Sequence, residues 1–326
     1  MPLRATDTPA SPLRRTLLLA LGLAPFSTFS QPANQVPPRP GRDWNEPIGP
    51  TIADLPSEHY VFQRLSLESA DGQRRYRIDI GTPRRPPPPA GYPALYMLDG
   101  NAALHTLQPQ DLATLAAGDP PVLIGIGYDV PGRHDVLARA FDYTPPVIRD
   151  GQPDPNVEER GRPGGGADIF LDLFEQRIRP EVLARAAIDP RRQTLWGHSY
   201  GGLLALHTLM TRPALFQRYV AGDPSMGWHD GVLLRTADGF RAEQAPGVTV
   251  RILVGGSQPR RAPGTPPPPP PASVIPGVPP GRESAYQLVE RLAAEGMDIT
   301  FEAFPEQNHG QLFATSLYPA LRVAVR

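Results

Sequence analysis

Two kinds of hydrophobic pattern follow each other along the chain. Residues 60–67 and 74–80 alternate apolar and polar positions around the turn signal Asp71-Gly72, which predicts an antiparallel strand pair. Later runs are short and mostly apolar, as is typical of central strands in a parallel sheet. These runs are residues 94–98, 122–126, 194–196, 219–221 and 249–254, and a last strand is predicted at 299–304.

Helical patterns lie between the apolar runs, at residues 168–185, 203–210 and 284–295. Strands that alternate with helices predict a mostly parallel central sheet with helices on both faces. The predicted fold class is therefore α/β, with an antiparallel N-terminal strand pair ahead of the parallel strands.

Proline, at 44 of 326 residues, marks the segments outside this pattern. Residues 31–56 are a proline-rich lead-in with little means of burying itself, and one domain is predicted at 57–326. Within that domain, residues 128–166 are expected to form a loop region over the top of the sheet. Residues 259–280 hold six consecutive prolines and are predicted to be a disordered insertion.

The first thirty residues have the features of an export signal peptide. Arg14-Arg15 precede an apolar run at residues 17–24, and Thr28 and Ser30 suit a cleavage site. The run is shorter than the roughly 18–20 residues that span a bilayer. The paired arginines resemble a twin-arginine signal, and a general secretory signal is the alternative. We expect an exported, periplasmic protein without a membrane span.

The composition of the chain excludes several kinds of catalytic chemistry. The chain has no cysteine, and all 32 of its cationic residues are arginine, so thiol chemistry and lysine-based chemistry are excluded. A formal charge of −1 argues against general nucleic-acid binding. Hydroxyl, imidazole and carboxylate chemistry remains, and we expect no cofactor and no metal.

The segment Gly197-His198-Ser199-Tyr200-Gly201 matches the G-x-S-x-G pattern of a nucleophile elbow. An apolar strand pattern leads directly into it, and a helical pattern follows it. The flanking glycines leave room for the sharp turn that exposes the serine hydroxyl. Ser199 is the predicted nucleophile.

Serine needs a base to become a nucleophile, and in this arrangement the base follows the last strand. Of the seven histidines, only His309 lies just beyond the final predicted strand. His309 is the predicted base.

The acid that would orient His309 is ambiguous. Glu283, at the start of a predicted helix, is preferred, and Asp223, directly after the strand at 219–221, is the second candidate. A Ser–His dyad is the third, because a backbone carbonyl or water could fix the imidazole in place of an acid.

The oxyanion of acyl transfer needs preorganised donors. We predict the backbone N–H of Tyr200, after the nucleophile, and the backbone N–H of Asn101, in the turn after the strand at 94–98.

Several segments together resemble a known family. They are Gly91-Tyr92-Pro93-Ala94-Leu95-Tyr96-Met97-Leu98-Asp99-Gly100-Asn101, Ile124-Gly125-Ile126-Gly127-Tyr128, and Arg139 with Phe141-Asp142-Tyr143-Thr144-Pro145. Residues 197–202, Asp223-Pro224-Ser225 and Asn308-His309-Gly310 follow in the same order. They resemble the putative-esterase branch of the α/β-hydrolases, and most of all its periplasmic siderophore esterases, which hydrolyse enterobactin- and salmochelin-type trilactones.

The resemblance implies an α/β-hydrolase fold, with Ser199 and His309 as nucleophile and base. It also implies an anionic catecholate substrate, which Arg139 would contact through its forked donors. Trp228, shortly after the strand at 219–221, is a candidate for stacking on aromatic rings or for the core. The sequence departs from the family at Asp223, where a small residue is expected.

The predicted function is that of a serine esterase that hydrolyses the ester bonds of a catecholate trilactone siderophore, iron-loaded or iron-free, to release iron. The alternatives are an exported esterase for another acyl or aryl ester, of feruloyl or acetyl type, and a non-catalytic siderophore-binding protein on a hydrolase scaffold.

Overall fold

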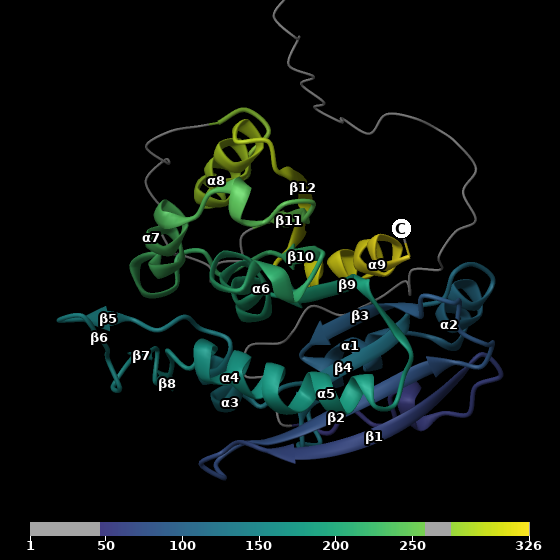
Figure 1. Cartoon of the computed structure of the whole chain (residues 1–326). Coiled ribbons are helices and arrows are strands. Elements are labelled where there is room, and N and C mark those ends of the chain that lie inside the picture. Colours follow the sequence, from purple (N-terminus) through teal and green to yellow (C-terminus); the bar gives the residue numbers. More distant parts are fainter. Residues whose placement is uncertain (1–45, 258–274, 326) are drawn as a thin grey trace, which may run out of the picture. The chain divides into compact units, whose positions relative to one another are not determined.

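The computed structural model describes residues 46–257 and 275–325. The predicted export signal and most of the lead-in and of the proline insertion lie outside these residues. Eight strands form one sheet in the order β1-β2-β4-β3-β9-β10-β11-β12 (Figure 1). They are β1 (Tyr60–Glu68), β2 (Arg75–Pro83), β3 (Tyr92–Leu98), β4 (Val122–Tyr128), β9 (Ile188–His198), β10 (Arg218–Gly222), β11 (Thr249–Ser257) and β12 (Asp298–Asn308).

One strand of the sheet, β2, runs opposite to all the others. β2 runs antiparallel to both of its neighbours, β1 and β4, whereas every pair from β4 to β12 is parallel. All seven residues of β3 and of β4 are buried, as the apolar runs predicted. The predicted fold class and the N-terminal antiparallel pair are both confirmed.

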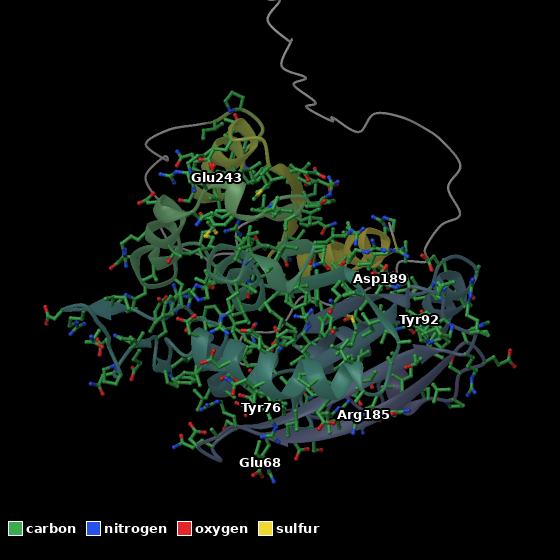
Figure 2. All side chains as sticks on the ribbon, in the orientation of Figure 1. Glu68, Tyr76, Tyr92, Arg185, Asp189 and Glu243 are labelled. Carbon is green, nitrogen blue, oxygen red and sulfur yellow. The ribbon has the colours of Figure 1, made fainter. Side chains whose placement is uncertain are left out.

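Helices cover both faces of the sheet. The larger hydrophobic cluster joins one face to the apolar sides of α4, α6, α7 and α8, and the smaller cluster joins the other face to α1, α2 and α9. The helices are α1 (Gly100–Thr106), α2 (Pro109–Ala116), α3 (Val136–Asp142), α4 (Ala167–Leu173), α5 (Arg179–Leu183), α6 (Tyr200–Thr211), α7 (Val232–Gly239), α8 (Glu283–Ala294) and α9 (Leu312–Ala324). Figure 2 shows side chains filling these layers, with the buried Tyr76 on β2 and the exposed Glu68 at the end of β1 labelled.

Three segments differ from expectation. The predicted loop at 128–166 contains α3 and two short hairpins, β5 (Ile148–Arg149) with β6 (Gln152–Pro153) and β7 (Glu158–Glu159) with β8 (Arg162–Pro163). The predicted helix at 168–185 is divided by a π-helical turn, Phe174–Ile178, between α4 and α5. The lead-in is not wholly exposed, because Ile52 packs into the smaller cluster and Thr51 caps a 3₁₀ turn at Ile52–Asp54.

Candidate active site

Four polar residues each follow immediately after a strand of the parallel part of the sheet. Asp99 follows β3, Ser199 follows β9, Asp223 follows β10 and His309 follows β12. Parallel strands bring their carboxyl ends to one edge of the sheet, where α/β proteins place their ligands. The topology therefore gathers these side chains at one edge.

Ser199 occupies the sharp turn between β9 and α6. Its backbone has φ +61° and ψ −115°, which is strained for a residue with a side chain. Its N–H donates to the carbonyl of Gly222 on β10 at 2.9 Å. A Cβ atom at Gly197 would lie 2.3 Å from the backbone of Gly201, so the turn requires glycine there.

Ser199, His309 and Asp223 form a connected chain of hydrogen bonds. The Ser199 hydroxyl lies 3.0 Å from His309 Nε2, and His309 Nδ1 lies 2.5 Å from Asp223 Oδ2. Because a carboxylate only accepts, Nδ1 carries the proton and Nε2 is left to accept from serine. The His309 side chain is 48% exposed and that of Asp223 is fully buried, so substrate can reach the base and not the acid.

The structure reverses the preference for Glu283 as the acid. Asp223 contacts the imidazole, whereas Glu283, the first residue of α8, makes no hydrogen bond or ion pair with His309 among the described residues. Asp223 has φ +41°, and its N–H donates to the carbonyl of Leu253 at 2.6 Å, which fixes the turn after β10. Its place directly after the strand beside the nucleophile strand was the signal that favoured it.

Two further residues, to which the motif analysis assigned no role, contact this chain of hydrogen bonds. His198 Nε2 donates to the carbonyl of His309 at 2.8 Å, and the two imidazole rings lie 4.6 Å apart. Burial and the neighbouring His309 hold the pKa of His198 well below its usual value, so the ring is neutral. The Ser225 hydroxyl lies 3.3 Å from that of Ser199.

The first turns of α6 and α1 border the nucleophile. The first bonds inside these helices run from Leu203 N to Ser199 O and from Ala103 N to Asp99 O, so the earlier N–H groups have no acceptor within their helix. The N–H groups of Tyr200 and Asn101 are among them. The Asn101 side chain holds the chain after β4, because its amide donates to the carbonyls of Tyr128 and Val130 at 3.0 and 3.1 Å.

The guanidinium of Arg139 binds a buried carboxylate of the protein itself. Its Nε and Nη2 donate to the two carboxylate oxygens of Asp99, both at 2.7 Å, and His134 Nδ1 lies 3.2 Å from the same carboxylate. The forked donors expected to contact substrate are therefore engaged by Asp99. The guanidinium also lies 5.3 Å above the ring of Tyr200, so it connects the starts of α1 and α6.

The Asp99 carboxylate is stabilised in its charged form. Burial alone would raise the pKa of Asp99, but Arg139 and His134 outweigh burial and hold it well below its usual value.

Trp228 belongs to the core. It is 4% exposed, and a Cβ at Gly164 would lie 2.7 Å from its ring. Of the two roles that the sequence left open, this burial supports packing in the core.

The parallel sheet, the strained serine after a central strand and the Ser–His–Asp hydrogen bonds define an α/β-hydrolase. Comparison with known proteins identifies the family within this class. A family model described as "Putative esterase" matches residues 69–227. The apo-salmochelin esterase of Escherichia coli O6:H1 strain CFT073 is 33% identical over 275 residues, which are 84% of this chain and 82% of that protein.

Other relatives agree. Ferri-bacillibactin esterase BesA of Bacillus subtilis strain 168 is 36% identical over 183 residues, 53% of this chain and 62% of the relative. The solved structure of "Enterobactin and Salmochelin Hydrolase IroE" is 31% identical, with a TM-score of 0.68 over 84% of this chain and 98% of that one. The chain belongs to the putative-esterase family and is a carboxylic ester hydrolase.

Within residues 46–257 and 275–325, every helix is too short or too polar to cross a bilayer.

Proposed function

We propose that this protein is a serine esterase that opens the ester bonds of a catecholate trilactone siderophore. The observation that carries the proposal is the hydrogen-bonded chain from the Ser199 hydroxyl through His309 to the buried Asp223. The substrate class follows from the relatives, whose names specify salmochelin, bacillibactin and enterobactin.

The first half-reaction forms an acyl-enzyme. Ser199 Oγ attacks the ester carbonyl while His309 Nε2 takes its proton. The charge that develops on the carbonyl oxygen is held by the N–H of Tyr200 and by an N–H at the start of α1, for which Asn101 is our candidate. The ester C–O bond then breaks, and His309 returns the proton to the leaving hydroxyl.

The second half-reaction releases the acid. A water molecule gives its proton to His309 and attacks the acyl carbonyl, and Ser199 leaves with the proton that His309 returns. Asp223 accepts from Nδ1 throughout, which fixes the tautomer and stabilises the imidazolium in both transition states.

The Ser199→Ala variant tests this function. The parent enzyme and the variant are incubated with ferric and iron-free enterobactin, and chromatography resolves the linear trimer, dimer and monomer. We expect these products from the parent enzyme alone, with substrate binding retained in the variant. Residual activity above a tenth of the parent rate would remove Ser199 as the nucleophile. Turnover of simple aryl esters without turnover of enterobactin would place the substrate outside the siderophores.

We further propose that residues 1–30 are a signal peptide, read by the twin-arginine or the general secretory route, that directs the enzyme to the periplasm. Fractionation of an expressing Gram-negative host, followed by sequencing of the mature N-terminus, tests this. The expected product lies in the periplasm and begins at Gln31, and an intact cytoplasmic chain would contradict the proposal.

A further inference from the structure

Arg282 contacts the same carboxylate as the base. It lies at the N-terminal end of α8, and its Nη2 donates to Asp223 Oδ2 at 2.8 Å. The same carboxylate oxygen accepts from His309 Nδ1. Asp223 therefore shares one oxygen between an imidazole and a guanidinium.

A second set of contacts fixes this arrangement. Arg282 Nε donates to the carbonyl of Gly255 on β11 at 3.3 Å, and the N–H of Gly255 points to Asp223 Oδ1 at 3.4 Å. Gly255 and Arg282 flank the proline-rich insertion on its two sides. The described residues on either side of that insertion thus converge on Asp223.

Among the described residues, four lie close to His309 or to the carboxylate that it contacts. Asp223 and Ser199 contact its ring from the ends of β10 and β9, His198 lies beside it at the end of β9, and Arg282 reaches the same carboxylate from the start of α8. His198 is neutral because its burial lowers its pKa. Among these contacts, the charged groups are the Asp223 carboxylate and the Arg282 guanidinium.

We propose that Arg282 is a positioning residue of this active site, which holds the Asp223 carboxylate against His309 and extends the activity to lower pH. The guanidinium places a positive charge beside the imidazole and disfavours a second positive charge there, which should make the activity less sensitive to acid than Asp223 alone would allow. Its two hydrogen bonds also restrain the carboxylate, whose rotation would misplace Nδ1. This inference rests on the proposed function of the same site.

The test compares Arg282→Gln, which removes the charge, with Arg282→Lys, which keeps it without the planar fork. Arg291→Met is the matched control: Arg291 lies on the same helix and donates to the carbonyls of Phe240 and Ala237, away from the triad. Phosphorylation of Ser199 by diisopropyl fluorophosphate, which releases fluoride, is followed from pH 5 to 9. The values of kcat and KM on an aryl ester and the melting temperature are measured alongside.

The acidic limb is the part of the pH profile in which the labelling rate falls as the pH is lowered. In Arg282→Gln this limb should move to a higher pH by about 0.5–1 unit. The shift is modest because His309 is half-exposed. Its plateau rate should fall about tenfold with KM within twofold of the parent. Arg282→Lys should keep the position of the limb and lose plateau rate about threefold. Arg291→Met should melt earlier and leave both the limb and the plateau unchanged.

An unmoved limb in Arg282→Gln overturns the proposal. If that variant does not fold, a plateau in Arg282→Lys equal to that of the parent overturns it instead. Labelling requires no siderophore, so a parent enzyme that labels but leaves enterobactin intact refutes the proposed substrate and still tests Arg282.

Discussion

The same three side-chain types, aspartate, histidine and arginine, occur together twice beside the nucleophile. The catalytic cluster is Asp223 with His309 and Arg282, and the sealed cluster is Asp99 with His134 and Arg139. Both aspartates directly follow a parallel strand, with φ of +41° and +53°.

The two clusters differ in their access to solvent. In the sealed cluster the histidine and arginine side chains are 13% and 12% exposed, against 48% and 28% in the catalytic cluster. His309 also turns its second nitrogen to Ser199, while burial lowers the pKa of His134 and disfavours its charged form. In the proposed mechanism, identical groups thus support the fold at one strand end and chemistry at the other, and the two clusters differ in the exposure of the imidazole.

Breaking the catalytic cluster should have the largest effect. Asp223→Asn is expected to lower kcat by two to four orders of magnitude with KM nearly unchanged, because the carboxylate acts mainly on the imidazolium of the transition state. Steady-state kinetics on an aryl ester measure this, with circular dichroism as the check on folding. Glu283→Gln is the matched control and should change kcat less than about threefold. A nearly unchanged kcat in Asp223→Asn would mean that the site works as a Ser–His dyad.

Breaking the sealed cluster should affect stability next. Asp99→Asn leaves Arg139 buried without its counter-charge, which should lower the free energy of unfolding by about 3–5 kcal/mol. Urea denaturation followed by tryptophan fluorescence measures the loss. Asp172→Asn, which removes an exposed partner of Arg212, should cost less than about 1 kcal/mol. Equal losses in the two variants would show that the Asp99 cluster contributes no more than a surface ion pair.

The Arg139→Lys variant tests whether Arg139 serves the sealed cluster or contacts the substrate. Lysine keeps the charge and loses the two parallel bonds to Asp99, so stability should fall by about 1–2 kcal/mol. If Arg139 acts internally, kcat should fall severalfold while KM for a siderophore ester stays within about twofold. A raised KM with unchanged kcat would instead restore Arg139 as a substrate contact.

The smallest expected effect concerns His198, which lies beside the catalytic cluster. Its pKa is lowered in the fold, so below about pH 6.5 the unfolded chain binds a proton that the folded chain does not, and stability falls as pH falls. One such histidine contributes a slope of up to about 1.4 kcal/mol per pH unit. His198→Gln should remove that share of the slope between pH 6.5 and 5.5, leaving the parts due to His105 and His134, whose pKa values are also lowered. Urea midpoints at the two pH values measure it, and parallel slopes in parent and variant would refute it.

Local sequence pattern predicted the strands well. All eight predicted strands occur, because each is a compact apolar or alternating run bounded by turn residues. Five helices, α1, α2, α3, α7 and α9, were not predicted. α1 is short and begins with glycine, and α9 contains Pro319, so local propensity alone does not favour either.

The candidate site was predictable only where a residue's role follows from its place along the chain. Ser199 was placed by its motif and His309 by its position after the last strand, and the structure sets the two side chains 3.0 Å apart. The choice between Asp223 and Glu283 depends on which carboxylate the fold brings to the imidazole. Arg139 likewise offers the same donors to a substrate or to Asp99, and only burial and distance decide between them.

The anchoring of the proline-rich insertion at both of its ends has a consequence for how this enzyme can diversify. Gly255 and Arg282 are hydrogen-bonded to each other and to Asp223. These two residues, between which the insertion lies in the sequence, are therefore held beside the active site. Closing a chain between two fixed ends costs only about 0.6 kcal/mol more for each doubling of its length. Length and composition can therefore drift there between lineages, or be replaced by a grafted peptide, at little thermodynamic cost to the catalytic geometry.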